Sequence, residues 1–261
     1  MNPQIRMSEK IKISSIIIAK DEKENIRRCI ESQADVVDEI VVMVDSRTMD
    51  NTFQIASSYG NVKAEVAAFT GYARTKSYAL SKTKFDWVLW IDADEELTLE
   101  LAAELREFKN VQPKFAAYDV ARRAYFLGKW IKHSGWYPAR VVRLFNKKHA
   151  SFNDKAVHEH LDINGETGHL KYDLNHYTDP TIEHYFEKFN AYTSLAAQEL
   201  SKKGKKASFS DIVFRPIFLF MKMYIFRAGF LDGMHGFILA IFSSAYVFTK
   251  YSKLWELNKK K

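Results

Sequence analysis

The chain has 261 residues, and its 47% hydrophobic content is enough to bury a sizeable core in one large domain or two smaller ones. Its 39 Lys and Arg outnumber its 32 Asp and Glu, and the formal net charge of +7 predicts an anionic partner: nucleic acid, a phosphorylated ligand or an acidic membrane surface. Cys29 is the only cysteine, which excludes an internal disulfide and favours a reducing compartment, and we expect it in the core. Residues 1–15 lack an apolar core of signal-peptide length, so we expect a short polar leader on a cytoplasmic protein.

The first hundred residues alternate between strand and helix patterns. Apolar runs predict strands at 13–19, 39–44, 62–66 and 87–91. All but the weaker run at 62–66 lack polar alternation, which predicts burial on both faces, as in a parallel sheet. Helical patterns lie between the strands at 22–33, 51–59 and 72–82. This order predicts an α/β fold built on an open, doubly wound, mostly parallel sheet with right-handed crossovers.

The next hundred residues are less regular. A predicted helix at 98–109 precedes three strands of mixed polarity at 118–126, 139–146 and 169–177. A long amphipathic helix then follows over 180–203, and Gly204 closes it.

The last stretch is apolar but interrupted by charges. Residues 233–249 contain no Asp, Glu, Lys or Arg, but a bilayer span needs about 20 residues. The preceding piece, 214–231, carries Lys222 and Arg227. We therefore predict a helical hairpin in the membrane interface, with flanking basic residues for anionic headgroups. The sequence leaves open whether 233–249 spans the membrane or lies on it.

Three short segments follow the predicted strands directly: Ala19-Lys20-Asp21, Asp45-Ser46 and Asp92-Ala93-Asp94. Ligands of doubly wound sheets bind beyond the carboxyl ends of the strands, so these residues are the candidate ligand site. Asp45 could bond a ribose or base, or simply form a turn with Ser46. A dinucleotide fold would need a Gly-rich turn after the first strand, which is AKDEKEN here, and no P-loop motif is present.

The acid pair Asp92 and Asp94 has two interpretations. Carboxylates one residue apart suit a Mg²⁺ or Mn²⁺ ion that also binds a nucleotide diphosphate. Alternatively, Asp94 caps the helix at 98–109 and Glu95 and Glu96 complement its dipole. The preceding strand and the acids at neighbouring strand ends favour the metal, with the two glutamates left to the helix or the sugar.

Further candidates lie on the predicted helix at 72–82 and in the second hundred residues. Lys76 could reach a phosphate, although a solvated surface lysine is the ordinary outcome. In VHEHL, Glu159 could take a proton from an acceptor hydroxyl, and His158 and His160 share one face, as a zinc pair or as structural hydrogen-bonding groups.

Upstream of VHEHL, GWYPARVVRLF contributes two arginines and an aromatic ring. Arg140 or Arg143 could neutralise phosphate charge. The ring of Trp136 could stack on a sugar or simply pack.

The motifs SIIIAKDEKENI, VVMVDSRTMDNT, GYARTKSYAL and WVLWIDADEEL, in this order, resemble the family-two inverting glycosyltransferases with a GT-A fold. The later segments GWYPARVVRLF, VHEHL and the apolar tail resemble a narrower branch, the bacterial lipopolysaccharide core β-glucosyltransferases. The resemblance implies a nucleotide-sugar-binding half at 1–110, an acceptor-binding half at 111–205 and a membrane-association segment at 206–261.

The resemblance also implies roles for the donor-side residues. Ala19, Lys20 and Asp21 line the donor, and Asp45 lies by the nucleoside. Ser46 stands where many members have a second Asp, and Arg47 replaces a frequent glycine. Lys76 faces nucleotide or phosphate.

At the reacting end, the resemblance implies that Asp92 and Asp94 form the DxD motif that holds Mg²⁺ or Mn²⁺, with Asp94 the better ligand. Glu159 is the implied catalytic base. The acceptor or its phosphates would meet four residues, Trp136, Arg140, Arg143 and His158.

The implied reaction moves a sugar, which is glucose in that branch, from a UDP-sugar to a hydroxyl of a lipid-linked glycan. The implied acceptor is the lipopolysaccharide inner core. The implied location is the cytoplasmic face of the inner membrane, at its anionic lipids. Two alternatives stay open: a nucleotidyltransferase with a similar sheet, which would want a Gly-rich basic loop, and a membrane-peripheral adaptor. A nucleic-acid partner is disfavoured because the positive charge gathers near the apolar tail and not on an aromatic-studded sheet.

Overall fold

The computed structural model describes residues 10–152 and 161–259, without the side chain of Tyr72. The described residues form two compact units by chain contact: one from 1–122 and 140–176, the other from 123–139 and 177–261. Two strands run through both units, because β6 (Ala117–Phe126) and β11 (Thr167–Asp179) cross the boundaries between them.

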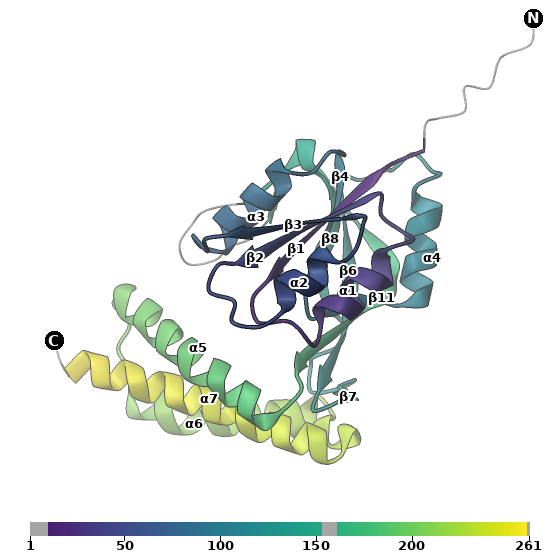
Figure 1. Cartoon of the computed structure of the whole chain (residues 1–261). Helices are drawn as coiled ribbons and strands as arrows, with labels where there is room; N and C mark the ends of the chain where they lie inside the picture. Colours follow the sequence, from purple (N-terminus) through teal and green to yellow (C-terminus); the bar gives the residue numbers. More distant parts are fainter. Residues whose placement is uncertain (1–9, 153–160, 260–261) are drawn as a thin grey trace, which may run out of the picture. The chain divides into compact units, whose positions relative to one another are not determined.

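The first unit begins with the predicted α/β alternation (Figure 1). Its parallel strands are β1 (Ile13–Ala19), β2 (Glu39–Asp45), β3 (Val62–Ala67) and β4 (Trp87–Trp90). The helices between them are α1 (Ile26–Gln33), α2 (Thr52–Ser57) and α3 (Tyr72–Ser81). The predicted strands are confirmed, whereas α1 starts later than the predicted 22, because the backbone forms a turn from Glu22 to Asn25.

Strand order explains where a ligand can bind. The sheet reads β3-β2-β1-β4-β8-β6-β11-β5, with β8 at Ala139–Asn146 and β5 at Glu95–Leu97. β1 pairs in parallel with both β2 and β4, so the chain's winding direction changes at β1. In α/β sheets the crevice at such a switch point is the ligand site, and the segments after β1 and β4 lie at that edge.

Both faces of β1, β2 and β4 are buried, as their unbroken apolar runs predict, whereas β3 has no fully buried residue. Ile13 and Ile17 pack on one face in a cluster that also contains side chains of α1, α2 and α4 (Leu99–Phe108). Ile16 points to the other face, where it joins Ala79 of α3. Cys29 is buried in the first cluster, as predicted. The fold is therefore a mixed α/β fold, as predicted, with antiparallel pairing where β8 meets β4 and where β5 meets β11.

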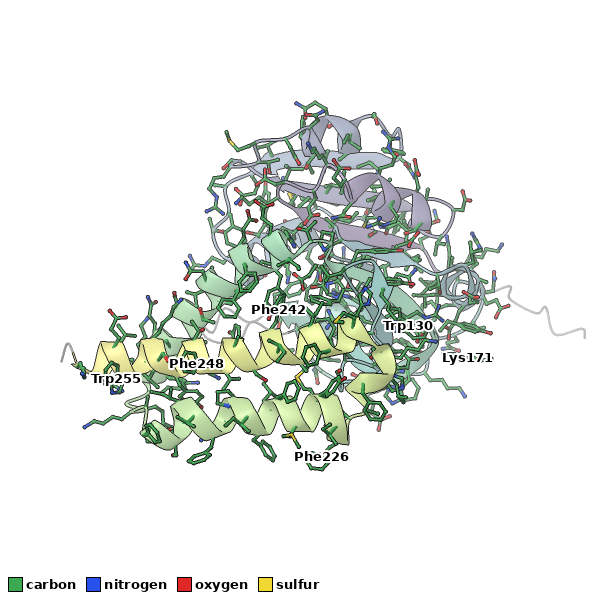
Figure 2. All side chains as sticks on the ribbon, turned by 90° about the horizontal axis from the view of Figure 1, so that it is seen from below. Trp130, Lys171, Phe226, Phe242, Phe248 and Trp255 are labelled. Carbon is green, nitrogen blue, oxygen red and sulfur yellow. The ribbon has the colours of Figure 1, made fainter. Side chains whose placement is uncertain are left out.

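The second unit is mostly helical. It contains α5 (Ile182–Lys202), α6 (Phe209–Phe220) and α7 (Met234–Lys259), with the short β7 (Lys129–Trp130) on the end of β6. α6 continues into a π-helical turn, Met221–Phe226, and a 3₁₀ turn, Gly229–Asp232, leads into α7. α6 and α7 lie side by side, as Figure 2 shows, so the predicted hairpin is present. Among the described helices, none has both the length and the apolar character that a bilayer crossing requires.

The remaining elements are small. A 3₁₀ turn covers Lys147–His149, and β9 (Ala150–Phe152) pairs antiparallel with β10 (Leu161–Ile163).

Candidate active site

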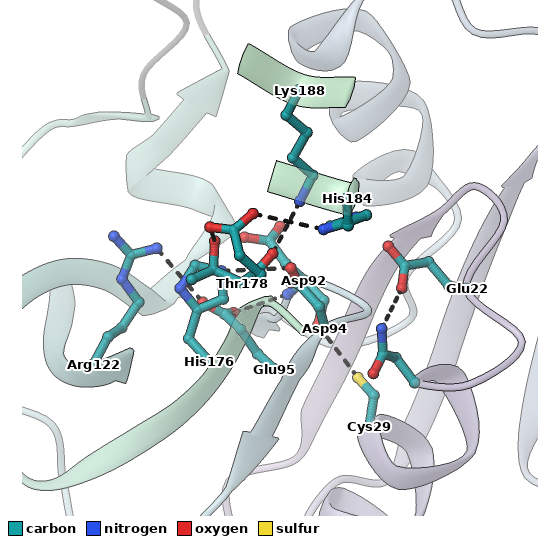
Figure 3. Close-up of polar contacts among 12 residues, drawn as sticks. Glu22, Cys29, Asp92, Asp94, Glu95, Arg122, His176, Thr178, His184 and Lys188 are labelled. Atoms are coloured by element: carbon teal, nitrogen blue, oxygen red, sulfur yellow. Dashed lines mark hydrogen bonds and ion pairs between the residues drawn. The ribbon is translucent and has the colours of Figure 1, made fainter. Parts of the chain in front are cut away.

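The segment after β4 places four acids close together, and the buried Arg143 holds two of them. Figure 3 shows Asp92, Asp94 and Glu95 of this segment together with His176 and Arg122. One nitrogen of Arg143 donates to both the Asp92 carboxylate and Glu95 Oε1, the latter at 2.6 Å. Arg143 is only 3% exposed and Glu95 is fully buried. Arg122 adds a second positive charge 3.8 Å from Glu95 Oε1. An internal guanidinium thus satisfies these acids, which would otherwise be costly to bury.

The pKa directions follow from this arrangement. Burial raises the pKa of Glu95 above its ordinary value, and the attraction of Arg143 opposes but does not cancel that effect. For Asp92, burial also favours the neutral form, but the charges of Arg143 and Lys76 outweigh it and hold the pKa below its usual range. Asp92 therefore stays ionised as the partner of Arg143.

Trp90 connects the basic groups around Asp92. Its indole Nε1 donates to Asp92 Oδ1 at 3.2 Å. Lys76 Nζ lies 3.9 Å from the ring centroid, and Arg143 Cζ lies 4.5 Å from it. Cations over an indole face are attracted by its quadrupole. The ring thus positions two cations next to the acid at the end of β4.

Asp94 has a different environment. Its carboxylate lies outside the arginine network, and its Oδ2 is 3.5 Å from His176 Nε2 of β11. The pairing of β5 with β11 sets His176 opposite Glu95, which explains the approach. The Asp94 side chain is 19% exposed and that of Asp92 is 37% exposed, so the feature that leaves the Asp94 oxygens for an additional ligand is the separation from Arg143 and not a greater exposure.

Asp94 does not cap the following helix. The cap of α4 is Thr98, whose side chain accepts from Leu101 N at 3.2 Å. Glu95 and Glu96 belong to strand β5 and not to the approach to that helix. The capping interpretation of the acid pair is therefore wrong, and so is the assignment of Glu95 to the helix or the sugar, since Glu95 binds Arg143. Glu96 accepts from Asn175 Nδ2 at 3.2 Å, and its contact with the sugar stays a prediction.

A metal at this site would need ligands beyond the protein. Within residues 10–152 and 161–259, no group of three or more His, Cys, Asp and Glu side chains is arranged to hold a metal ion. Mg²⁺ and Mn²⁺ sites that bind nucleotides commonly use only one or two protein ligands, with water and phosphate oxygens for the rest. Asp94 with His176 fits that sparse type of site.

At the end of β2, Asp45 is buried and already paired. Arg47 Nε donates to both of its oxygens, at 3.0 and 3.2 Å, and Arg47 Nη2 donates to Oδ2 at 2.5 Å. These hydrogen bonds hold the pKa of Asp45 below its usual value. The Arg47 side chain is largely exposed and lies 5.3 Å from the centroid of the Phe69 ring. A nucleoside that bonds to Asp45 would have to displace or accommodate Arg47.

The segment after β1 has a structural role. Asp21 adopts a positive φ of 55°, and its Oδ1 accepts from Met49 N at 2.7 Å, which ties the loop after β1 to the loop after β2. Lys20 Nζ is 3.7 Å from Asp21 Oδ2. Lys20 and Asp21 thus lie at the same sheet edge as Asp45 and Asp92, as predicted.

Comparison with known proteins identifies the family. The sequence matches the family model for "Glycosyl transferase family 2" over residues 14–169, more than half of the chain. This chain belongs to glycosyl transferase family 2. An uncharacterized glycosyltransferase of Rickettsia typhi is 35% identical over 95% of this chain and 88% of its own length.

Two further relatives complete the comparison. A lipopolysaccharide core biosynthesis glycosyltransferase of Rhizobium meliloti is 27% identical over 96% of this chain and 94% of its own length. The solved structure of a mannosyltransferase from Pyrobaculum calidifontis, in complex with GDP-Man and Mn²⁺, superposes with a TM-score of 0.56 at 12% identity, covering 97% of this chain and 89% of that one. It supports the GT-A fold. Family membership favours glycosyl transfer over the nucleotidyltransferase and adaptor alternatives.

Two of the predicted acceptor residues of this glycosyltransferase, Arg140 and Arg143, bind different groups. Arg140, three residues before Arg143 on β8, donates to Asp119 Oδ1 at 2.6 Å and to the Leu170 carbonyl at 2.7 Å, and not to the acids after β4. Residues three apart on a strand face opposite sides, which explains the separation. Arg143 is buried against acids and not presented to a phosphate.

The other candidates are divided between the second unit and the undescribed segment. Trp136 lies in the second unit, where its ring is 6.2 Å from that of Phe126. His158, Glu159 and His160 lie outside the described residues, so their roles stay predictions.

Sequence reasoning missed Trp90, Glu95, Arg122 and His176 as members of the site. The sequence could have indicated Trp90, because it is two residues before Asp92 and residues two apart in a strand point to the same side. His176 gave no signal, since only the pairing of β5 with β11 brings it to Asp94.

Proposed function

We propose that this glycosyltransferase is an inverting, metal-dependent enzyme that transfers glucose from a UDP-sugar to a hydroxyl of the lipopolysaccharide or lipooligosaccharide inner core. The Rhizobium meliloti relative, named for lipopolysaccharide core biosynthesis and aligned over nearly its whole length, supports the acceptor class. The observation that carries the catalytic part is the contrast between Asp92, which Arg143 binds, and Asp94, which lies beside His176 and accepts no hydrogen bond from Arg143 in the described part of the chain.

Asp94 and His176 would hold the divalent ion. The ion would supply Lewis-acid stabilisation of the diphosphate as negative charge develops on it. A carboxylate suits Mg²⁺ or Mn²⁺, whereas an imidazole nitrogen suits transition metals better than Mg²⁺, so we assign Mn²⁺ as the preferred ion. Asp92 acts by positioning: it fixes Trp90 and Arg143, and thereby the loop that carries Asp94.

The chain's own residues account for the remaining steps. Lys76, held on the Trp90 ring, offers a positive charge to the departing diphosphate. Glu159 takes the proton of the acceptor hydroxyl, and the acceptor oxygen attacks the anomeric carbon from the side opposite the nucleotide. The bond from that carbon to the diphosphate breaks as the new glycosidic bond forms, which inverts the configuration in one step.

We also assign a membrane surface to the second unit. On α6 and the π-helical turn, an apolar face of Phe214, Ile217, Phe218, Met221, Ile225 and Phe226 is between 40% and 74% exposed. The spacing of three and four residues places most of these side chains on one side of the helix. Exposed apolar patches of this kind commonly mark membrane or protein interaction sites. A peripheral position on the cytoplasmic face of the inner membrane, among anionic lipids, would bring the enzyme to a lipid-linked acceptor.

The test of this function is a donor and acceptor screen. The purified enzyme is given nucleotide sugars with Mn²⁺ and truncated lipopolysaccharide cores, and the products are read by mass. We expect one added hexose from UDP-glucose. The absence of any sugar addition, with every donor and core, would refute the proposed reaction.

Glu159→Gln tests the catalytic base, with the exposed Glu166→Gln as its matched control. Loss of the general base should lower transfer by roughly 10²–10⁴-fold while donor binding is retained. The control should transfer as the wild type does. Near-normal transfer by Glu159→Gln would assign the base to another residue.

A further inference from the structure

The second unit contains a pocket that the proposed chemistry does not use. It has a volume of about 410 Å³ and lies among the loop at 134–136, Tyr185 of α5, the π-helical turn and α7. Small-molecule pockets typically measure about 300–1,000 Å³, so the space suits part of a ligand.

The charge of the pocket wall is positive. Lys222 and Arg227 line it, and no Asp or Glu is among its described lining residues. Neither cation forms an ion pair with any residue in the part of the chain that the structure describes. Other cations of this unit are engaged, such as Arg215 with Asp211 and Lys203 with Glu199. The pocket thus keeps two positive charges for an external anion.

The π-helical turn explains why both cations line the same pocket. The Arg227 N–H donates to the Lys222 carbonyl at 2.8 Å, an i to i+5 bond. In an α-helix, residues five apart would point in different directions, whereas a π turn sets them one above the other. π-helical turns are frequent at functional sites for this kind of reason.

The surrounding loop is fixed in place. The Arg227 carbonyl accepts from Ser134 N at 2.9 Å, and the buried Asp232 carboxylate accepts from His133 N at 2.9 Å. Gly135 has a φ of +79°, and a Cβ there would lie 2.5 Å from Arg227 Nη1. A glycine at this position therefore leaves space for the guanidinium.

The rest of the wall is aromatic and apolar. Trp136, Tyr185 and Tyr246 line it together with Met223. Burial, with Asp179 and Tyr246 nearby, raises the pKa of Tyr185 to about 12, so its hydroxyl remains a hydrogen-bond donor at neutral pH. The exposed Phe226, at 74%, adjoins Arg227 in the chain and belongs to the apolar face. Cations and hydroxyl donors next to an apolar surface suit a ligand with an anionic head and an acyl tail.

We infer that this pocket binds the phosphate group of a membrane amphiphile, with the acyl part lying along the apolar face of α6. Arg227 would bind two phosphate oxygens through its fork, and Lys222 would add a point charge. The inference rests on the proposed function only in placing the enzyme at a membrane. The phosphate could belong to a bilayer phospholipid or to a phosphorylated acceptor glycolipid, and the experiment separates the two.

The probe is dihexanoyl phosphatidic acid, a short-chain phosphate amphiphile that stays monomeric, titrated calorimetrically into the full-length protein without nucleotide sugar. We expect one site per chain, with affinity reduced about fivefold for each removed charge, hence about 25-fold in Lys222→Gln/Arg227→Gln. Arg227→Lys keeps the charge but loses the paired N–H donors of the guanidinium, so its affinity should lie between those of the wild type and the double variant. The matched control Lys205→Gln/Lys206→Gln removes two exposed charges of the same unit outside the pocket and should bind as the wild type does.

Three results would overturn the inference: no binding by the wild type, equal binding by the pocket variant, or an equal loss in the control. Inorganic phosphate binding as tightly as the amphiphile would also overturn it, since the acyl part would then be irrelevant. Displacement of the probe by truncated lipopolysaccharide in neutral detergent assigns the phosphate to the acceptor, and its failure assigns it to bilayer phospholipid. Because no sugar transfer is measured, failure of the donor assays leaves this result unaffected.

Discussion

One site in each unit shows how differently charged side chains can be used. Around Glu95 in the first unit, charged groups are buried and neutralise one another: Glu95 is fully buried, and Arg143 binds both it and Asp92. In the second, large apolar side chains stay exposed, and the cations Lys222 and Arg227 form no ion pair with a described residue. The first pattern fixes a polar site within the protein, whereas the second prepares a surface for something outside it.

The largest expected effect comes from breaking the buried charge network. Arg143→Met leaves Glu95 buried without its main counter-charge, and removal of one partner of a buried pair costs roughly 3–5 kcal/mol. The free energy of unfolding in urea measures the loss. Arg140→Met, on the same strand but in a partly exposed pair with Asp119, should cost only about 1 kcal/mol. Equal losses in the two variants would contradict the central role given to Arg143.

The next effect concerns the exposed apolar face. Phe218→Ser and Phe226→Ser should each weaken partitioning onto lipid vesicles by roughly 10- to 150-fold, because each removes about 1.5–3 kcal/mol of apolar burial. The measurement is sedimentation with vesicles that contain anionic phospholipid. Val111→Ser, an exposed apolar residue of the first unit, is the control and should leave partitioning unchanged. Unchanged binding by both Phe variants would remove the membrane assignment.

The smallest effect concerns Asp45 and Arg47. The pKa of Asp45 is lowered from 3.8 mainly by the Arg47 hydrogen bonds, so the pair stabilises the fold above pH 3.8 and loses this contribution as the pH falls through the lowered pKa. In Arg47→Gly that part of the pH dependence should disappear, with a stability change of no more than about 1 kcal/mol at neutral pH. The variant should also bind UDP more tightly, since Asp45 becomes available to the nucleoside.

Urea unfolding at several pH values and UDP titration test this prediction together. Weaker UDP binding in Arg47→Gly would show that Arg47 contacts the nucleotide and does not block it.

The parallel half of the sheet could be predicted because its strands carry their own signal. The unbroken apolar run of 13–19 is buried on both faces, as such a run requires. The acids at the ends of β2 and β4 could likewise be placed at one edge, because parallel strands share their carboxyl ends. Local pattern and topology were sufficient for these features.

The different environments of Asp92, which binds Arg143, and Asp94, which lies beside His176, could not be predicted in this way. These environments depend on two long-range strand pairings. The antiparallel pairing of β8 with β4 brings Arg143 to Asp92, and the pairing of β11 with β5 brings His176 to Asp94. The three-residue strand at Glu95–Leu97 was mistaken for the approach to a helix, since so short a strand has no periodicity of its own. Long-range pairing decided both outcomes.

The most direct test of the account is the affinity for UDP, measured with and without Mn²⁺, in the wild type, in Asp94→Ala and in the control Asp86→Ala. Asp86 carries the same carboxylate as Asp94, but it forms an exposed ion pair with Lys148 and belongs to no proposed metal site. Manganese should strengthen UDP binding in the wild type and the control, and this effect should vanish in Asp94→Ala. An undiminished manganese effect in Asp94→Ala would contradict the assignment of the ion to that carboxylate.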